Sequence, residues 1–266
     1  MSKSSVPELI QSDNLSLGWW VVMEKLMQRG VQAITPLTLS ITGFDDDGSP
    51  AEIPDIRKAV DAFLEAEGKR DVENIAWTIF PQRYWEMSGG DRKTFFEMFR
   101  EAFPRIQEFN PKNNRRGSYF QRLVDFEGDG SGSIDQLEWI LSEYESNPDG
   151  RRSKWQASTF DPRRDHLSMP YLEFPCLQQV SFTFADDDGL VINAFYATQQ
   201  IARKGYGNYL GIARLGAFMA SQMDRSLVRM NVFVGVAHMD IGKTHDNLLT
   251  LMTAIETALD KDSVPA

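Results

Sequence analysis

The chain has little that points to a disulfide framework, a membrane or a polyanion. It holds one cysteine and three histidines in 266 residues, which excludes an intrachain disulfide and a cysteine-rich metal site. Lysine and arginine number 28 against 38 aspartates and glutamates, so the net charge is −10. That charge argues against a nucleic-acid polymer as partner, because such binding needs cationic side chains that neutralise phosphates. A small anion in a local arginine pocket stays compatible with it.

Long hydrophobic runs are also missing. None approaches the roughly 18–20 residues that span a bilayer, and the start, MSKSSVPELIQSDN, lacks the apolar region of a signal peptide. We therefore expect a cytoplasmic protein with no membrane partner and no metal. Hydrophobic residues make up 42% of the chain, which suffices for a substantial core and excludes wholesale disorder.

One domain is predicted over residues 15–260, because no repeat, low-complexity block or linker divides the chain. Residues 1–14 and 261–266 are polar and are expected to be flexible tails. Segments with the apolar spacing of helices are 17–27, 55–67, 95–109, 134–144, 210–223 and 248–259. Segments that alternate like strands are 37–41, 228–236 and a hairpin over 180–184 and 190–196. Helices early and strands late favour an α+β fold with a mostly non-parallel sheet.

The single cysteine stands just ahead of the predicted hairpin, in Leu172-Glu173-Phe174-Pro175-Cys176. A lone cysteine is commonly an inert member of a core, whereas a proline directly before it at a strand entrance favours a displayed thiol. A nucleophilic role would need a cationic neighbour or a helix N-terminus that favours the thiolate.

Three segments, taken in their order and spacing, resemble thymidylate synthase. The first runs from Asp135-Gln136-Leu137 to Asn147-Pro148-Asp149-Gly150-Arg151-Arg152, the second is Phe174-Pro175-Cys176, and the third runs from Leu190 through Asn208 to His238. Residues 37–43 are also similar to the family's Leu-Ser-Ile-x-Gly segment. The resemblance covers roughly residues 15–250. It implies an α+β fold with a large mixed sheet flanked by helices, packed sheet to sheet in a homodimer.

The resemblance also implies chemical roles. Cys176 would add to C6 of a pyrimidine ring and so make C5 a carbon nucleophile, and Tyr119 matches a tyrosine of the catalytic site. Arg151 and Arg152 match paired arginines that reach across the dimer interface to the substrate phosphate, which two guanidinium forks suit. Without the resemblance, the two arginines would be a solvated loop.

Two further positions match substrate-binding residues of the family. Asn208 matches an asparagine whose amide reads the edge of the base, although it is also an ordinary residue for a helix entrance. His238 matches a histidine near the sugar hydroxyl, although a buried histidine with satisfied hydrogen bonds has the same sequence pattern.

Other positions depart from the family. Gln82, in Gln82-Arg83-Tyr84-Trp85, stands where the family has its catalytic glutamate, and a glutamine cannot transfer protons. Glu86 is the nearest carboxylate, in a different register. Gln200 stands for the aspartate that contacts the base, and Asp240 for the tyrosine two residues after the histidine.

The family's remaining phosphate-binding groups are also replaced. Ala33 and Ala197 stand near or at the places of two arginines, Thr198 follows where the family has serine, and Leu177 replaces a histidine. The C-terminal segment that folds over the folate is missing as well. These changes gather at one place and indicate a changed substrate, a changed reaction or lost catalysis.

The first reading of function is an enzyme. It would transfer a one-carbon unit, methyl or hydroxymethyl, from methylenetetrahydrofolate to C5 of an atypical pyrimidine nucleotide through a covalent bond between Cys176 and C6. The alternative is a nucleotide-binding or structural dimer on the same fold, which Gln82 and the missing C-terminal segment favour.

A third reading is calcium binding. Residues 127–138 place oxygen-bearing side chains at the spacing of a single EF-hand-like loop. Its first position is Glu127 in place of the usual aspartate, and no second loop accompanies it, although such loops normally work in pairs.

Overall fold

The computed structural model describes residues 7–109, 111, 117–127, 132–166, 168, 175–185 and 189–262. The main sheet contains β1 (Glu8–Ser12), β2 (Ala33–Ile34), β3 (Leu37–Ile41), β6 (Gln156–Ser158), β7 (Leu177–Phe184), β8 (Leu190–Gln200) and β9 (Leu227–His238). A separate two-stranded sheet pairs β4 (Phe126–Glu127) with β5 (Ser133–Ile134). The α-helices are α1 (Leu15–Met27), α2 (Pro54–Ala66), α3 (Val72–Trp77), α4 (Gln82–Met87), α5 (Arg92–Phe109), α7 (Tyr119–Val124), α8 (Gln136–Ser146), α9 (Pro162–Asp165), α10 (Tyr206–Gln222) and α11 (Asp246–Asp262). A 3₁₀ turn, η1 (Arg152–Lys154), and a π-helical turn, η2 (Ile201–Gly205), complete the described elements.

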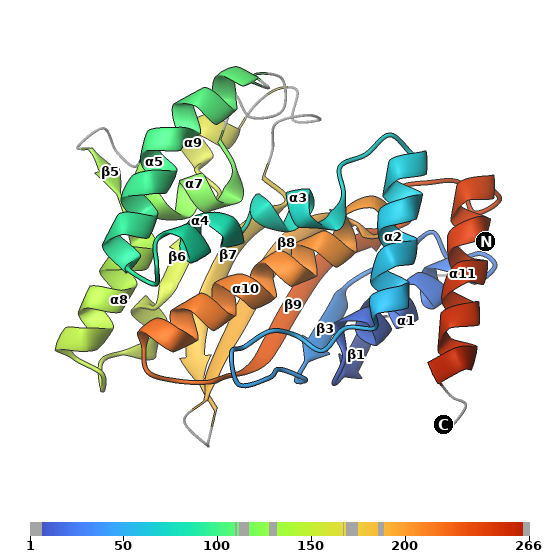
Figure 1. The fold of residues 1–266 in the computed structure, drawn as a ribbon, viewed down its shortest axis with the longest axis horizontal. Helices are drawn as coiled ribbons and strands as arrows, with labels where there is room; N and C mark the ends of the chain where they lie inside the picture. The colour runs from blue at the N-terminus through green and yellow to red at the C-terminus, as the bar shows by residue number, and fades with distance from the viewer. Residues whose placement is uncertain are drawn as a thin grey trace.

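The main sheet has seven strands in the order β1-β3-β9-β8-β7-β6, with β2 also paired to β9. β1 runs parallel to β3 and β8 runs parallel to β9, while the other pairs are antiparallel. The predicted hairpin is present, with Val180 opposite Ala194 and Phe182 opposite Ile192. The prediction of a mixed sheet flanked by helices is therefore confirmed (Figure 1).

The N-terminal segment differs from its prediction. Residues 8–12, expected in a flexible tail, form the edge strand β1, whose Ile10 is buried opposite Leu39. The segment has only two neighbouring apolar residues, so periodicity alone does not reveal it. Its order comes from backbone pairing with β3, which lies far along the chain and leaves no local pattern. Residues 1–6 and 263–266 lie outside the described residues.

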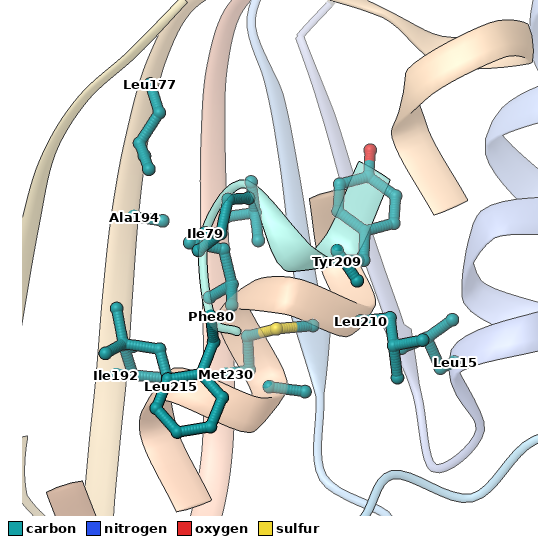
Figure 2. Packing of buried hydrophobic residues seen from close by; sticks show 14 of the residues in the cluster. Leu15, Ile79, Phe80, Leu177, Ile192, Ala194, Tyr209, Leu210, Leu215 and Met230 are labelled. Carbon is teal, nitrogen blue, oxygen red and sulfur yellow. The ribbon is translucent and has the colours of Figure 1, made fainter. Parts of the chain in front are cut away.

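The long helix α10 lies across one face of the sheet (Figure 1). It is apolar nearly all round and buried along most of its length, as expected for a helix with protein on every side. Glycines allow a close approach to α3, because a Cβ at Gly211 would stand 2.8 Å from the Ala76 carbonyl oxygen. Phe80, Leu215 and Ile192 lie close together in this layer (Figure 2).

At one end of the molecule α2 and α11 lie side by side, and at the other end α5, α7 and α8 form a second group (Figure 1). An aromatic cluster joins that second group to α10. Phe99 and Phe120 meet edge to face with ring centroids 4.7 Å apart, and Phe95 lies 5.6 Å from Phe218 of α10. None of the described helices is both long and apolar enough to cross a bilayer.

The spacing of buried residues changes near the end of β8 and β9. Buried positions alternate from Ile192 to Tyr196 and from Met230 to Val234. The next buried residues, Gln199 and Ala237, come three residues later on each strand. The two changes lie side by side, because Tyr196 pairs with Val234 and Gln199 with Ala237. Side chains of a strand alternate between the two faces of the sheet, so a step of three between buried residues means that the buried side chains change to the opposite set of positions. Gln199 therefore faces the helices, where Tyr209 of α10 donates a hydrogen bond to its side chain at 2.9 Å.

The opposite face of the sheet carries exposed apolar side chains. Phe195 and Phe233 are stacked with their centroids 5.5 Å apart, and both remain more than a third exposed. The strand register places Leu9 in the same row through Thr38. Beside this row, the Asn231 amide donates to the Asn193 side chain at 2.9 Å.

An ion-pair network ties α2, α3 and α10 together and leads to a first testable expectation. Glu73 accepts hydrogen bonds from Arg214 at 2.6 Å and from Arg57 at 2.8 Å, and these guanidiniums lower the pKa of its carboxyl to about 2. A carboxyl whose pKa is lowered on folding adds stability above its unfolded pKa, and this gain is lost as pH falls toward the folded value.

We expect Glu73→Gln to lower the free energy of unfolding by about 1 kcal/mol at pH 7, because solvent screens a side chain that is 51% exposed. The difference from the unchanged protein should shrink as the pH falls below about 4.5. Urea unfolding at several pH values measures it, with the exposed Glu65→Gln of α2 as control. A deficit that stays constant down to pH 3 would contradict this origin.

Candidate functional site

Cys176 lies directly before β7, and its side chain is partly buried. Its carbonyl oxygen accepts a hydrogen bond from the Ala197 N–H at 3.1 Å, which fixes it against β8. Tyr119, the first residue of α7, donates a hydrogen bond to the thiol sulfur. The structure therefore brings together the two residues that the sequence predicts to be catalytic.

Buried contacts hold α7 in place beside the cysteine. The guanidinium of Arg122 donates to both carboxylate oxygens of Asp165, at 2.6 and 2.9 Å, and to the Thr159 carbonyl at 2.7 Å. Asp165 is fully buried, so this pair depends on its bidentate geometry to offset the loss of hydration. The Phe120 N–H also donates to the Thr78 carbonyl at 2.9 Å. These contacts set the position of Tyr119, three residues before Arg122.

Tyrosine hydroxyls gather on the helix side of Cys176. Burial raises the pKa of Tyr119, Tyr196 and Tyr209, and the neighbouring Tyr119 and Cys176 raise that of Tyr196 further. All three hydroxyls are therefore protonated donors at neutral pH. The Tyr196 hydroxyl and the Gln199 amide nitrogen are buried without a hydrogen-bond partner among the residues that the structure describes. Such orphaned donors are rare in folded proteins and indicate an absent water or ligand group.

One cation acts on the thiol. Burial is the largest influence on Cys176 and raises its pKa, while the Tyr119 hydrogen bond and the ammonium of Lys204 lower it. The net direction is upward, so the thiol is protonated at neutral pH. Lys204 belongs to η2, and its own pKa is lowered by desolvation and by the charges of Arg70 and Lys69.

Asp240 holds η2 through hydrogen bonds to its backbone. Its carboxylate accepts hydrogen bonds from the Ala202 N–H at 3.1 Å and the Arg203 N–H at 3.4 Å. Arg203 in turn donates to the Asp240 carbonyl at 2.6 Å and pairs with Glu67 at 2.6 Å. Asp240, predicted to bind substrate, therefore bonds to the backbone of the turn that carries Lys204.

Three other predicted substrate-binding residues lie at this end of the sheet. Asn208 is buried in the first turn of α10. Gln200 is exposed and pairs with His238 across β8 and β9, three residues beyond the Ala197 that bonds to Cys176. The His238 Nδ1 atom lies 3.3 Å from the Thr198 hydroxyl.

The paired arginines lie elsewhere in the chain. Both Arg151 and Arg152 are exposed, and the Arg152 guanidinium lies over the ring of Phe184, 5.9 Å from its centroid. Phe184 ends β7, whereas Cys176 precedes its start. Eight residues of strand separate them by about 25 Å, so the arginines of the same chain do not reach this cysteine.

The replacement candidates for the missing glutamate contact each other. Gln82 donates a hydrogen bond to Glu86 at 3.1 Å along α4, and Glu86 is exposed. The backbone of Thr78, just after α3, contacts α7 next to Tyr119. The side-chain hydrogen bond described for Gln82 and Glu86 is thus the one between them.

Four residues of the predicted calcium loop, 128–131, lie outside the described residues. Of its described candidate ligands, Asp135 pairs with Arg100, and Glu138 pairs with Arg92 at 2.8 Å. Burial raises the pKa of Asp135 to about 6. In the part of the chain that the structure describes, no three histidine, cysteine, aspartate or glutamate side chains gather as a metal site would require.

Sequence reasoning did not find Tyr196, Gln199 or Lys204. Tyr196 continues the ordinary alternation of β8, which does not mark it as a site residue, and Gln199 reaches the site only because the burial spacing changes, which no local pattern shows. Lys204 has a weak sequence signal, its position just before a long helix. A basic residue just before a long helix is opposed by the helix dipole, so its presence there calls for a reason.

No known protein family model matches the chain, and no curated protein matches it.

The thiol chemistry can be measured directly because Cys176 is the only cysteine. We expect alkylation by iodoacetamide to be slower at pH 7 than that of a small free thiol, and to rise with pH beyond the range where a free thiol is fully ionised. Its raised pKa keeps the reactive thiolate scarce.

The variant Lys204→Met should shift this profile to higher pH, because it removes a cation that stabilises the thiolate. The exposed Lys58→Met of α2 serves as control and should leave the profile unchanged. A midpoint below that of a free thiol would contradict the dominance of burial.

Proposed function

We propose that the protein transfers a one-carbon unit to C5 of a pyrimidine nucleotide, with Cys176 as covalent nucleophile. The observation that carries this proposal is the setting of the thiol. It receives a hydrogen bond from Tyr119, lies near the cation of Lys204, and borders buried donors that have no partner among the described residues. The resemblance to thymidylate synthase supplies the reaction type.

In the first step the thiol passes its proton to solvent water, and the thiolate forms the sulfur–C6 bond. The electrons of the C5–C6 double bond move toward C5 and the carbonyl oxygen at C4, which makes C5 nucleophilic. Tyr119 stabilises the thiolate as it forms, since a hydrogen bond to a charged sulfur is stronger than one to a neutral thiol. The hydroxyl of Tyr196, protonated and without a partner in the described chain, is suited to donate to a ring oxygen.

Methylenetetrahydrofolate would supply the carbon in such a reaction. The side chains around Cys176 offer hydrogen-bond donors to one polar ring and cations to one anion, and none of the described residues singles out a folate. We therefore derive no step through the cofactor. Its requirement is decided by the experiment that follows.

Trapping with 5-fluoropyrimidine nucleotides tests the nucleophile, because fluorine at C5 blocks the final elimination. Intact-protein mass spectrometry should show an adduct on Cys176, and the panel of uracil and cytosine nucleotides, ribose and deoxyribose, identifies the substrate. Incubation with and without methylenetetrahydrofolate shows whether it is required. We expect no adduct with Cys176→Ser, and about tenfold or slower trapping with Tyr119→Phe, because a hydrogen bond to a charge is lost.

Tyr144→Phe, near Phe184 at the far end of β7, is the matched control for Tyr119→Phe and should trap normally. An adduct or turnover that survives replacement of Cys176 would remove the proposed mechanism.

A second candidate is a nucleotide-binding dimer without turnover. The raised pKa of Cys176 and the mutual hydrogen bond of Gln82 and Glu86 favour it, since neither a thiolate nor a general base stands ready. Saturable nucleotide binding without any adduct would support this candidate against the enzyme.

We also propose that the protein is a homodimer joined through the open face of the sheet. The stacked Phe195 and Phe233 give that face an apolar row, and a two-fold axis lets one such patch bind its own copy. In this arrangement the exposed Arg151 and Arg152 would serve the site of the partner.

Light scattering should give roughly twice the chain mass of 30.3 kDa. Phe233→Glu should yield monomers, because a buried interface cannot hold an unpaired charge. Phe109→Glu changes an exposed phenylalanine of α5 and should remain dimeric. A monomeric unchanged protein at micromolar concentration would refute the dimer.

A further inference from the structure

Lys204, the cation that acts on the Cys176 thiol, has two further cations, Lys69 and Arg70, acting on it in turn. Lys69 and Arg70 follow α2 after Gly68, whose positive φ of 60° ends the helix. Lys204 belongs to η2, and its pKa is lowered first by desolvation and then by the charges of Arg70 and Lys69. All three side chains are exposed. They form a local positive patch on a chain whose net charge is −10.

An ion pair brings these segments together. Arg203 of η2 pairs with Glu67 at the end of α2, with 2.6 Å between nitrogen and oxygen. Glu67 is almost buried and also accepts a hydrogen bond from Asn247 at 2.7 Å. The Lys69 N–H donates to the Leu64 carbonyl at 2.8 Å, which holds the loop against α2. Lys204 directly follows Arg203, and Lys69 lies two residues after Glu67, so the pair holds the two segments that carry these lysines next to each other.

The acids next to the patch have other partners. Glu67 pairs with Arg203, and Asp240, whose charge also acts on Lys204, is bonded to the η2 backbone and to Arg203. None of the ion pairs among the described residues includes Lys69, Arg70 or Lys204. Like charges held together cost free energy unless an anion joins them.

We propose that Lys69, Arg70 and Lys204 bind the phosphate of the nucleotide whose ring reaches Cys176. This proposal rests on the proposed function and names the group that the site recognises within its own chain. Arg70 offers a planar fork of donors and the two lysines offer point charges, a combination that suits a doubly charged phosphate. Because Lys204 acts on the thiol as well as on the other two cations, the phosphate and the reacting ring belong to one ligand.

The cations at this place also account for the phosphate-binding arginines that the sequence lacks. Ala33 and Ala197 stand where the resemblance expects phosphate-binding arginines. The cations of η2 and of the loop after α2 would take over that task from different parts of the chain. η2 is a π-helical turn, a local distortion that is frequent at functional sites.

Calorimetry with pyrimidine nucleoside monophosphates, the matching nucleosides and inorganic pyrophosphate tests the proposal. We expect the unchanged protein to bind the monophosphate at least about tenfold more tightly than the nucleoside, as charge-assisted hydrogen bonds provide. Lys204→Gln, and the double change of Lys69→Gln with Arg70→Gln, should each reduce this preference several-fold while nucleoside affinity stays the same. Lys58→Gln on the exposed side of α2 should leave the preference intact.

Several results would overturn the proposal. One is an unchanged phosphate preference in both cluster variants, and another is its loss only when Arg151 and Arg152 are replaced by glutamine. A third is weaker binding of methylenetetrahydrofolate alone, which would assign the cations to its carboxylates. If no phosphate compound binds the unchanged protein, the proposal and the nucleotide substrate both fail.

The trapping experiment separates this proposal from the proposed function. A phosphate preference that depends on the cluster, without any adduct on Cys176, supports the anion site and overturns the transfer reaction. An adduct that forms equally well in the cluster variants, from monophosphate and nucleoside alike, supports the reaction and overturns the anion site.

Discussion

α10 is packed against the sheet on one side and α3 on the other, and the remaining structure is arranged around that burial. The packing requires glycine where α10 meets α3, since a Cβ at Gly211 would collide with the Ala76 carbonyl. It also fixes the start of the helix, which continues directly from η2. Because α10 cannot shift in its layer, the turn that carries Lys204 and the hydroxyl of Tyr209 have defined places at the end of the sheet. The site inherits its geometry from the core.

The forces on Cys176 oppose one another, and their ranking bears on mechanism. Burial outweighs both the Tyr119 hydrogen bond and the Lys204 cation, so the thiol is not preformed as thiolate. A phosphate bound at Lys204 would screen that cation further from the sulfur. Tyr119 would then be the main group that stabilises the thiolate. In the proposed reaction such a site would gain its rate from holding the ring against the sulfur, and the cations would contribute chiefly by placing the ligand.

Much of the fold could be predicted from sequence because the relevant signals are local. α2 repeats its buried residues Ile56, Val60, Phe63 and Leu64 at helical spacing, and the β7–β8 hairpin alternates on either side of a turn. β1 gave no such signal, since its order comes from pairing with β3. Short helices such as α3 and α4 escape periodicity for a different reason, because six residues hold too few turns.

The candidate site likewise contains residues that the sequence indicates and residues that only contacts between distant segments bring in. The resemblance placed Tyr119 and Cys176 together although 57 residues separate them, and the structure has them in contact. No pattern could join Lys204 to Lys69 and Arg70, because the link is an ion pair between Arg203 and Glu67. Gln199 likewise points toward Tyr209 only through the shift in burial spacing shared by β8 and β9. Contacts between distant segments and changes of strand face are the parts that one sequence does not encode locally.

The net negative charge of the chain limits the kind of ligand that the cationic cluster can bind. At physiological ionic strength charges are screened beyond about 8 Å, so a net charge of −10 neither attracts nor strongly repels an anion from afar. The cluster acts only on an anion already at the site. Recognition of this kind favours a ligand whose phosphate and ring fit together, and it gives little hold to a long polyanion, which needs many cations in a row. The sequence argument against nucleic-acid polymers and the local patch of positive charge thus both favour the proposed class of ligand, a small molecule that carries its own phosphate.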